Sequence, residues 1–121
     1  MKVLLINGSP GAKGCTYTVL TELKNTPEKE GIETELIHVG HKDIRGCIAC
    51  RKCAQTGKCV FDDVVNEVAP KLAEADAFIN GAPVYYASPA GGAIAFFDRL
   101  FFSTMNIGKT MKVGATVVTC R

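Results

Sequence analysis

The sequence predicts an α/β domain, a three-layer α/β/α sandwich around a parallel β-sheet. Short apolar runs typical of buried strands alternate with segments whose apolar residues recur at helical spacing. This alternation favours right-handed crossover connections, which place helices on both faces of the sheet. A chain of 121 residues is long enough for one such core, so we expect a single domain over residues 1–121.

The first part of the chain predicts two strands and one helix. Residues 2–7 (KVLLIN) form a continuous apolar run, typical of a strand buried on both faces, and GSPG ends it. Apolar residues then recur at helical spacing over residues 16–23, and we expect Pro27 and Gly31 to end this helix. Residues 33–39 predict a second strand nearer the sheet edge.

The rest of the chain predicts two helices and two strands. Asp62 or Asp63 can cap a helix over residues 64–75, whose apolar positions lie on one side, and Pro70 predicts a kink or a late start. The later elements are a buried strand over 77–82 ending at Pro83, a strongly apolar helix over 91–102, and a fourth strand over 112–119.

Composition and charge exclude several classes of protein. Fourteen Lys and Arg against 12 Asp and Glu leave a formal charge of +2, which indicates no nucleic-acid or membrane partner. No apolar run reaches the roughly 20 residues that span a bilayer. Met1-Lys2 leads directly into a strand rather than a signal peptide, so we expect a cytoplasmic location. There, six cysteines are expected to be thiols or metal ligands rather than disulfides.

The turn after the first strand is a candidate phosphate-binding loop. It reads GSPGAKGCT and opens a helix, so backbone N–H groups, hydroxyls and a helix N-terminus converge there. Ser9 and Thr16 can donate hydrogen bonds, and Lys13 adds positive charge. The glycine spacing does not fit the G-x-G-x-x-G of dinucleotide folds, so a Rossmann-bound NAD is not supported. The alternative is a plain strand-to-helix turn.

Four cysteines lie close together within residues 47–59. The spacing is C-x2-C-x2-C-x5-C, and a short irregular loop of this kind suits the corners of a four-iron four-sulfur (4Fe-4S) cluster. Zinc sites more often use two separated pairs. Two alternatives stay open, a zinc site and cysteines that hold no metal. The candidate ligands are Cys47, Cys50, Cys53 and Cys59.

Several stretches occur together in one known family. They are KVLLINGSP with Thr16-Tyr17, GCIACRKC with Cys59, FDD, LAEAD, and GAPVYYASP followed by FFDRLF. In this order they resemble the NADPH-dependent FMN reductase and iron-sulfur flavoprotein family, of flavodoxin-like fold. The resemblance covers essentially the whole chain and implies the strand order 2-1-3-4, the flavodoxin order without its fifth strand.

The resemblance also implies the site residues. Around the FMN phosphate it places Ser9, Gly14, Cys15, Thr16 and Tyr17. Along the ribityl chain and flavin ring it places Pro83, Val84, Tyr85 and Tyr86. The four clustered cysteines match the motif that holds a 4Fe-4S cluster in the iron-sulfur flavoproteins. Gly11 stands where the family loop often carries Arg, and Cys15 stands where Asn is common, which predicts weaker phosphate binding.

The function implied by the resemblance is an FMN-dependent oxidoreductase. FMN would take electrons from NAD(P)H or another reduced donor and pass them to a small molecule or a ferredoxin-like protein, directly or through the cluster. No side chain stands out for proton transfer, so we predict no catalytic acid or base. Two alternatives stay open: a non-enzymatic electron carrier that depends on ferredoxin-like partners, and a truncated chain without cofactors.

The end of the chain predicts an interface. Family members usually continue through a further helix and strand, so the fourth strand here would have an unpaired apolar edge. We expect either that another subunit covers this edge or that the chain is a truncated product. The helix over 91–102 carries more apolar residues than one sheet-facing stripe can bury, and we predict a homo-oligomer that uses it. The alternative is burial beneath a longer C-terminal segment.

Overall fold

Four long parallel strands form the sheet of the computed structural model, which describes residues 1–108 and 111–120. They are β1 (Lys2–Asn7), β2 (Glu33–His38), β3 (Ala77–Tyr85) and β5 (Val113–Thr119). Their order is β2-β1-β3-β5, so the predicted order is confirmed for the long strands. A fifth strand, the two-residue β4 (Ser88–Pro89), pairs antiparallel with the end of β3 and was not predicted.

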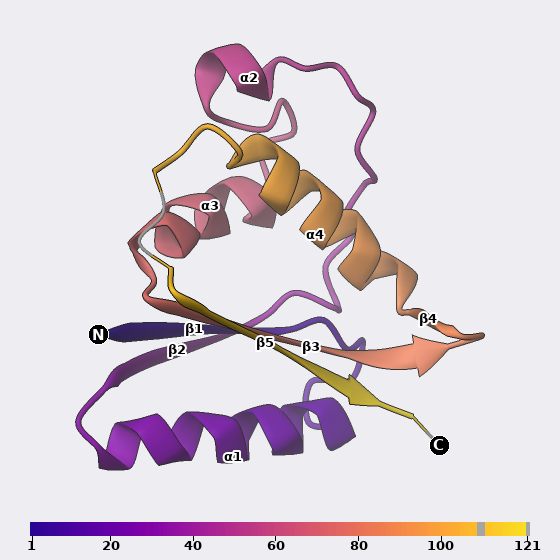
Figure 1. Ribbon diagram of the computed structural model, residues 1–121. Coiled ribbons are helices and arrows are strands. Elements are labelled where there is room, and N and C mark those ends of the chain that lie inside the picture. The colour runs from indigo at the N-terminus through magenta and orange to yellow at the C-terminus, as the bar shows by residue number, and fades with distance from the viewer. Residues whose placement is uncertain (109–110, 121) are drawn as a thin grey trace.

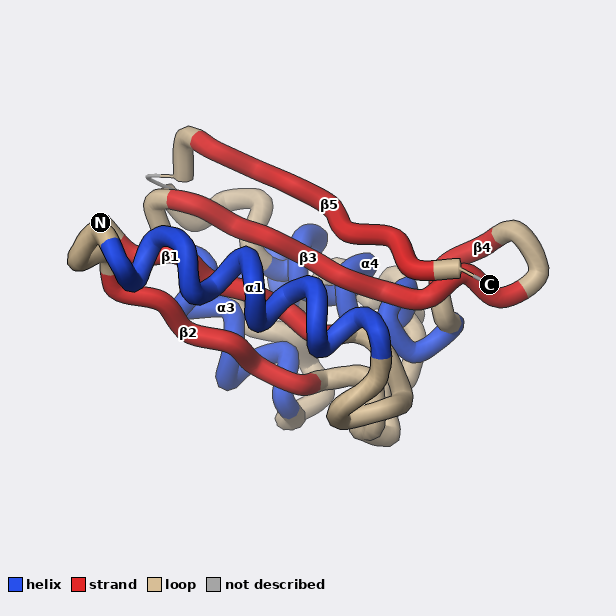
Figure 2. Tube along the Cα trace, turned by 90° about the horizontal axis from the view of Figure 1, so that it is seen from below, coloured by secondary structure: helices blue, strands red, loops and turns tan. Residues whose placement is uncertain are grey.

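Helices cover both faces of the sheet. Helix α1 (Cys15–Lys29) lies on one face, and α3 (Val64–Glu74) and α4 (Gly91–Ser103) lie on the other (Figures 1 and 2). The short α2 (Cys53–Thr56) lies farther from the sheet, beyond α3 and α4 (Figure 1). The flavodoxin-like α/β architecture predicted from the sequence is therefore present.

The centre of strand β1, residues 3–6, is apolar because its side chains alternate between two cores. Leu4 and Ile6 pack into the larger core, with side chains of α3 and α4. Val3 and Leu5 pack into the smaller core on the opposite face, with Leu20 of α1. Leu4, Leu5 and Ile6 are fully buried, and each such side chain stabilises the fold by about 1.5–3 kcal/mol. The central strand therefore joins the two helical layers.

Helix α1 ends at Lys29, between Pro27 and Gly31 as predicted, and Gly31 has φ 74°. Pro27 lies inside the last turn, where it removes one hydrogen bond without ending the helix. The late start predicted for α3 is wrong. Helix α3 starts at Val64 and runs through Pro70. An interior proline costs about 3 kcal/mol. Burial of Val65, Val68 and Leu72 at about 1.5–3 kcal/mol each outweighs that cost.

Strand β3 also continues beyond the end predicted at Pro83, and it reaches Tyr85. The last pair with β1 joins Asn7 to Gly81, so β1 needs no hydrogen bond from the Pro83 nitrogen. On the other side, β5 extends to Thr119, which lies opposite Pro83. The extra length carries β3 past β1 and out to the edge of the sheet where the strands end.

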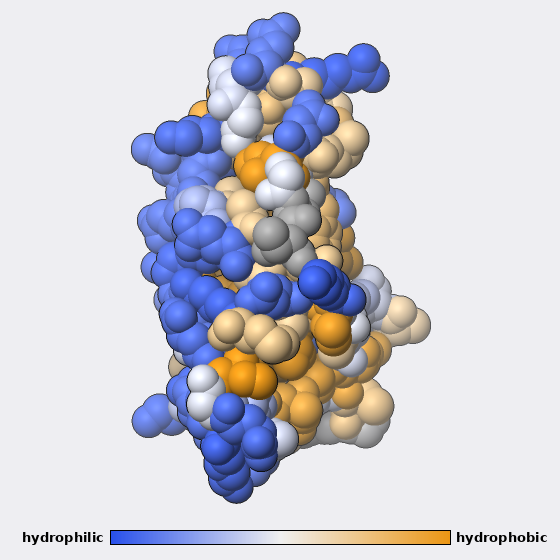
Figure 3. Space-filling view, turned by 60° about the vertical axis from the view of Figure 1, so that its left-hand side comes forward, coloured by the Kyte–Doolittle hydropathy of each residue, from blue (hydrophilic) through white to orange (hydrophobic). Residues whose placement is uncertain are grey.

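Apolar side chains remain exposed on α4 and β5. Phe101 and Phe102 are 43% and 42% exposed, and Val118 is 59% exposed, whereas Phe96 and Leu100 are fully buried. Only part of the apolar surface predicted for this helix is therefore open. Figure 3 shows one face on which hydrophobic residues gather beside a largely hydrophilic region. Among the described residues, no helix has the length and apolar character needed to cross a membrane.

Candidate functional site

The turn after β1 and the last residues of β3 meet at the carboxyl end of the sheet. A pocket of about 420 Å³ lies there, within the size range of small-molecule and cofactor sites. We call it the strand-end pocket. It is lined by Ser9, Cys15, Thr16, Pro83, Val84, Tyr85, Thr119 and Cys120. Segments far apart in the sequence thus form one site, where parallel α/β sheets bind their ligands.

Three residues of the predicted site lie outside this lining. Gly14 precedes α1, and its carbonyl accepts a hydrogen bond from the Thr18 N–H at 3.0 Å. Tyr17 lines a different hollow, between α1 and β2. Tyr86 is fully exposed at the tip of the β3–β4 hairpin, where it has φ 49°. For these three, a role in cofactor binding stays a prediction from the resemblance.

The end of β5 also lines the pocket, which the sequence reasoning missed. The Thr119 and Thr16 hydroxyl oxygens are hydrogen bonded at 2.8 Å, so β5 contacts the start of α1. Cys120 follows Thr119 and is exposed in the pocket wall. The signal was available, because the fourth predicted strand is parallel to the third and must end at the same edge of the sheet.

Hydrogen bonds fix the loop after β1. The buried Asn7 accepts from the Ser9 N–H at 3.0 Å through Oδ1, and Ser9 Oγ accepts from the Gly11 N–H at 3.2 Å. His38 Nε2 lies 2.7 Å from the Ser9 carbonyl oxygen and donates to it, since that oxygen can only accept. His38, to which the sequence analysis gave no role, therefore holds the candidate phosphate loop from β2.

Two glycines let this loop lie against the rest of the fold. A Cβ on Gly8 would lie 2.8 Å from the Ala93 Cβ, and a Cβ on Gly40 would lie 2.2 Å from the Ser9 carbonyl oxygen. The loop leads into α1, which begins at Cys15 without a side-chain cap. An uncapped helix N-terminus presents backbone N–H groups that attract anions. The local structure is therefore suited to a phosphate.

The four clustered cysteines line a second pocket, which we call the cysteine pocket. Its other polar side chains include Arg51 and Arg99. The free volume is about 20 Å³, room for about one water molecule. Over residues 1–108 and 111–120, no group of three or more metal-ligating side chains gathers around one point. The structure thus places the four predicted cysteines around one pocket, and their role as metal ligands stays a prediction.

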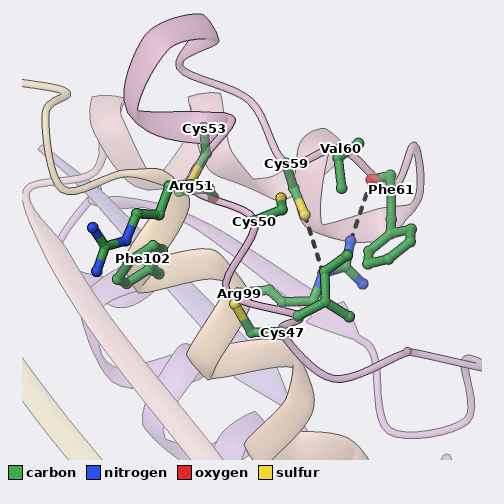
Figure 4. Close-up of a pocket in the computed structure, with 11 residues that line it drawn as sticks. Cys47, Cys50, Arg51, Cys53, Cys59, Val60, Phe61, Arg99 and Phe102 are labelled. Atoms are coloured by element: carbon green, nitrogen blue, oxygen red, sulfur yellow. Dashed lines mark hydrogen bonds between the residues drawn. The ribbon is translucent and has the colours of Figure 1, made fainter.

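Arg99 is buried beside the cysteines, with 1% of its surface exposed. Its NH1 and NH2 groups donate to Asp63 Oδ2 and Oδ1 at 2.6 and 2.9 Å, and its Nε donates to Cys59 Sγ at 3.2 Å (Figure 4). Burial alone would lower the pKa of Arg99, but the hydrogen bonds that Arg99 donates to Asp63 and Cys59 raise this pKa above its ordinary value. The guanidinium therefore stays charged in this pocket.

Asp63 and Asn66 connect the same pocket to α3. Asp63 is the N-cap of α3, and its Oδ1 accepts from the Val65 N–H at 3.0 Å. Asn66 lies in the first turn of that helix and bonds both backbone groups of Cys59, accepting from its N–H at 2.9 Å and donating to its carbonyl at 3.0 Å. Sequence reasoning identified the Asp63 cap but not Asn66 or Arg99.

Comparison with known proteins confirms the family and the fold that the sequence predicted. A family model described as NADPH-dependent FMN reductase matches residues 1–120. An iron-sulfur flavoprotein of Methanocaldococcus jannaschii is 38% identical over 96% of this chain and 63% of its own length. Iron-sulfur flavoproteins of Archaeoglobus fulgidus and Methanosarcina thermophila are 35% and 32% identical over 98% and 97% of this chain. The chain spans about three fifths of the length of these relatives.

Two solved structures resemble the whole chain in fold. An NAD(P)H:quinone oxidoreductase from Methanothermobacter marburgensis superposes with a TM-score of 0.76, at 16% identity, over 99% of this chain and 65% of the other. RosB, solved with a bound riboflavin-5'-phosphate derivative, gives 0.75 at 20% identity, over 100% of this chain and 52% of the other. At these identities the likeness concerns the fold.

Proposed function

The chain belongs to the NADPH-dependent FMN reductase family, and from this premise we propose that it is the FMN-binding part of a flavin oxidoreductase. In this proposal NAD(P)H is the electron donor, and the acceptor is a small molecule or a ferredoxin-like protein. One observation carries the proposal: the loop after β1 and the end of β3 line the same pocket of about 420 Å³ at the carboxyl end of the sheet.

The lining residues have suitable chemistry for a flavin nucleotide. Ser9 and Thr16 offer hydroxyl groups at the uncapped start of α1, where a phosphate would meet backbone N–H groups and the positive end of the helix dipole. Val84 and Tyr85 offer apolar and aromatic surface at the opposite wall for the ring. FMN, when bound, supplies the electron-transfer chemistry, and we assign no side chain as acid or base.

The cysteine pocket is the second part of the proposal, in which the four cysteines hold a 4Fe-4S cluster. Four thiols line one pocket beside a charged arginine, a donor set that suits a cluster of net negative charge. Zinc sites more often use two separated pairs of ligands, whereas these four cysteines all lie within residues 47–59. The free volume holds about one water, so residues 47–53 must move outward to admit a cluster.

The proposal includes a reducing, cytoplasmic setting and self-association. The cysteines must stay thiols to bind iron. Exposed Phe102 on α4 and Val118 on β5 offer an apolar surface that a second copy of the chain would cover in a homo-oligomer. The alternative is that further residues of a longer protein cover the same surface. Self-association of the 121-residue chain that is absent from a longer chain would support this alternative.

The FMN site is tested by titration with FMN, followed by quenching of flavin fluorescence. Thr16→Val keeps the shape of the side chain and removes the hydroxyl at the start of α1. We expect affinity to fall about tenfold, the effect of one or two hydrogen bonds to a charged group. Thr26→Val on the same helix is the matched control, since Thr26 is exposed. Equal affinities for all three proteins would contradict the site.

The redox activity is tested on FMN-loaded protein. Oxidation of NAD(P)H by the purified protein, followed at 340 nm, would support an enzyme. Flavin reduction only in the presence of a reduced ferredoxin would favour the alternative, a non-enzymatic electron carrier. A protein that takes up neither FMN nor iron and sulfide without oxygen would contradict both and favour a chain without cofactors.

A further inference from the structure

Cys59 is held by two helices before any cluster is present. Asn66 of α3 bonds its backbone N–H and carbonyl at 2.9 and 3.0 Å, and Arg99 of α4 donates to its sulfur at 3.2 Å. Cys47 and Cys50, in contrast, are exposed in a segment without helix or strand over residues 43–51. The four cysteines therefore differ in how far the fold has fixed them.

The guanidinium of Arg99 is fixed in its turn. Beside the Cys59 sulfur and the two Asp63 oxygens, NH1 donates to the Arg45 carbonyl and NH2 to the Phe61 carbonyl, each at 3.2 Å. All five N–H groups of the guanidinium thus have acceptors. The two-pronged pair with Asp63 sets the plane of the group, and Asp63 is itself fixed as the cap of α3. The remaining Nε–H can point only toward Cys59.

We propose that Arg99 and Asn66 are positioning residues that make Cys59 the first, preformed ligand of the cluster. Arg99 has a second effect, because an N–H bond to a ligating sulfur favours the more negative, reduced cluster and raises its reduction potential. Asn66 contacts only the backbone and affects assembly without changing the sulfur. The inference rests on the proposed 4Fe-4S site and adds two residues to its four cysteines.

A purely structural role is the competing explanation, in which Arg99 and Asp63 form a buried ion pair that happens to touch Cys59. Arg99→Lys distinguishes the two. Lysine keeps the positive charge beside Asp63, but a single ammonium group cannot serve Asp63, the Phe61 carbonyl and the Cys59 sulfur in the same plane. The variant therefore removes the bond to sulfur while retaining the charge.

The first experiment uses the cluster-free protein and needs no cofactor. Hydrogen exchange of the Cys59 amide is measured by NMR in the wild type and in Asn66→Ala. We expect exchange to be about tenfold faster in the variant, the effect of losing the hydrogen bond to Asn66 Oδ1. Asn25→Ala on α1 is the matched control. Equal exchange at Cys59 in all three would overturn the preformed state.

The second experiment compares anaerobically reconstituted wild type, Arg99→Lys and Lys29→Arg. Lys29 is exposed in the last turn of α1, on the other face of the sheet from the cysteine pocket, and its replacement also keeps the charge. We expect Arg99→Lys to have a lower reduction potential and to lose iron to a chelator about tenfold faster, with Lys29→Arg unchanged. Asn66→Ala should lose iron faster at an unchanged potential, and it tests the inference if Arg99→Lys does not fold.

The outcomes separate this inference from the proposed function. If the wild type binds no iron and sulfide, the cluster itself is refuted and the inference with it. If the wild type binds a cluster while Arg99→Lys and Asn66→Ala keep the wild-type potential and iron-loss rate, the positioning roles are overturned and the cluster stands.

Discussion

Replacement of Gly40 by alanine should destabilise the protein by displacing the loop after β1. The new Cβ would lie 2.2 Å from the Ser9 carbonyl oxygen and 2.3 Å from the Ser9 carbonyl carbon. Ordinary contact begins at 3.4 Å, so the loop must shift by about 1.2 Å, the difference between 3.4 and 2.2 Å. Both atoms belong to the backbone, and no side-chain rotation can relieve the contact.

The expected loss of stability is the difference between two destabilising contributions and one stabilising contribution. Overpacking that moves backbone costs about 1–3 kcal/mol. The shift also breaks the bond from His38 Nε2 to the Ser9 carbonyl, which contributes about 1 kcal/mol. Alanine gains about 0.4–1 kcal/mol by restricting the unfolded chain. The free energy of unfolding should therefore fall by about 2 kcal/mol.

Urea unfolding followed by circular dichroism measures this change. With a denaturant slope of about 1–3 kcal/mol per molar urea, the midpoint should fall by about 1 M, and affinity for FMN should fall with it. Gly46→Ala is the matched control, because a Cβ at Gly46 meets nothing within 4 Å. A Gly40→Ala midpoint equal to that of the control would refute the argument that Gly40 sets the position of the loop.

Three further predictions follow from described contacts. Asp63→Ala should lower the free energy of unfolding by about 3–5 kcal/mol, because it removes the α3 cap and leaves Arg99 buried without its partner; Asp63→Asn keeps the cap and should cost less in the same urea assay. Desolvation, and then nearby positive charge, hold the pKa of His41 below its ordinary 6.5. The unfolded state therefore binds more protons, so stability should rise as pH increases toward about 6.5 and then level off, and His41→Gln should flatten the part of this dependence that lies below about pH 6.5. Phe102→Glu should abolish self-association in sedimentation velocity while lowering stability by less than about 1 kcal/mol; an unchanged oligomer would contradict the proposed interface.

Much of the fold was predictable because local pattern and tertiary structure agree. Residues 3–6 are apolar at every position, which only a strand covered on both faces requires, and they form the centre of β1. Asp63 was one of two predicted caps, and its side chain caps α3. The error at Pro83 has a physical cause, because β1 has already ended there and needs no hydrogen bond from the Pro83 nitrogen.

The cysteine pocket shows what a sequence pattern alone does not reveal. The cysteine spacing predicts a shared site, but the contacts that fix Cys59 come from Asn66, seven residues on in α3, and from Arg99, 40 residues on in α4. A signal for Arg99 was present, since an arginine within the apolar run FFDRLF must be paired if it is buried. Its partner could not be identified, because pairing depends on how the two helices pack.

The turn between β3 and β4 holds a tyrosine in a backbone conformation that lowers the stability of the fold. Tyr86 and Ala87 have φ 49° and 63°, a two-residue hairpin geometry for which asparagine and glycine are the favoured residues. Each left-handed non-glycine residue costs roughly 1–2 kcal/mol. A chain optimised for folding alone would carry Asn-Gly here and melt at a higher temperature. This chain instead carries Tyr86, whose ring is fully exposed at the hairpin tip next to the pocket residue Tyr85, so heat resistance gained at this turn would come with the loss of that ring.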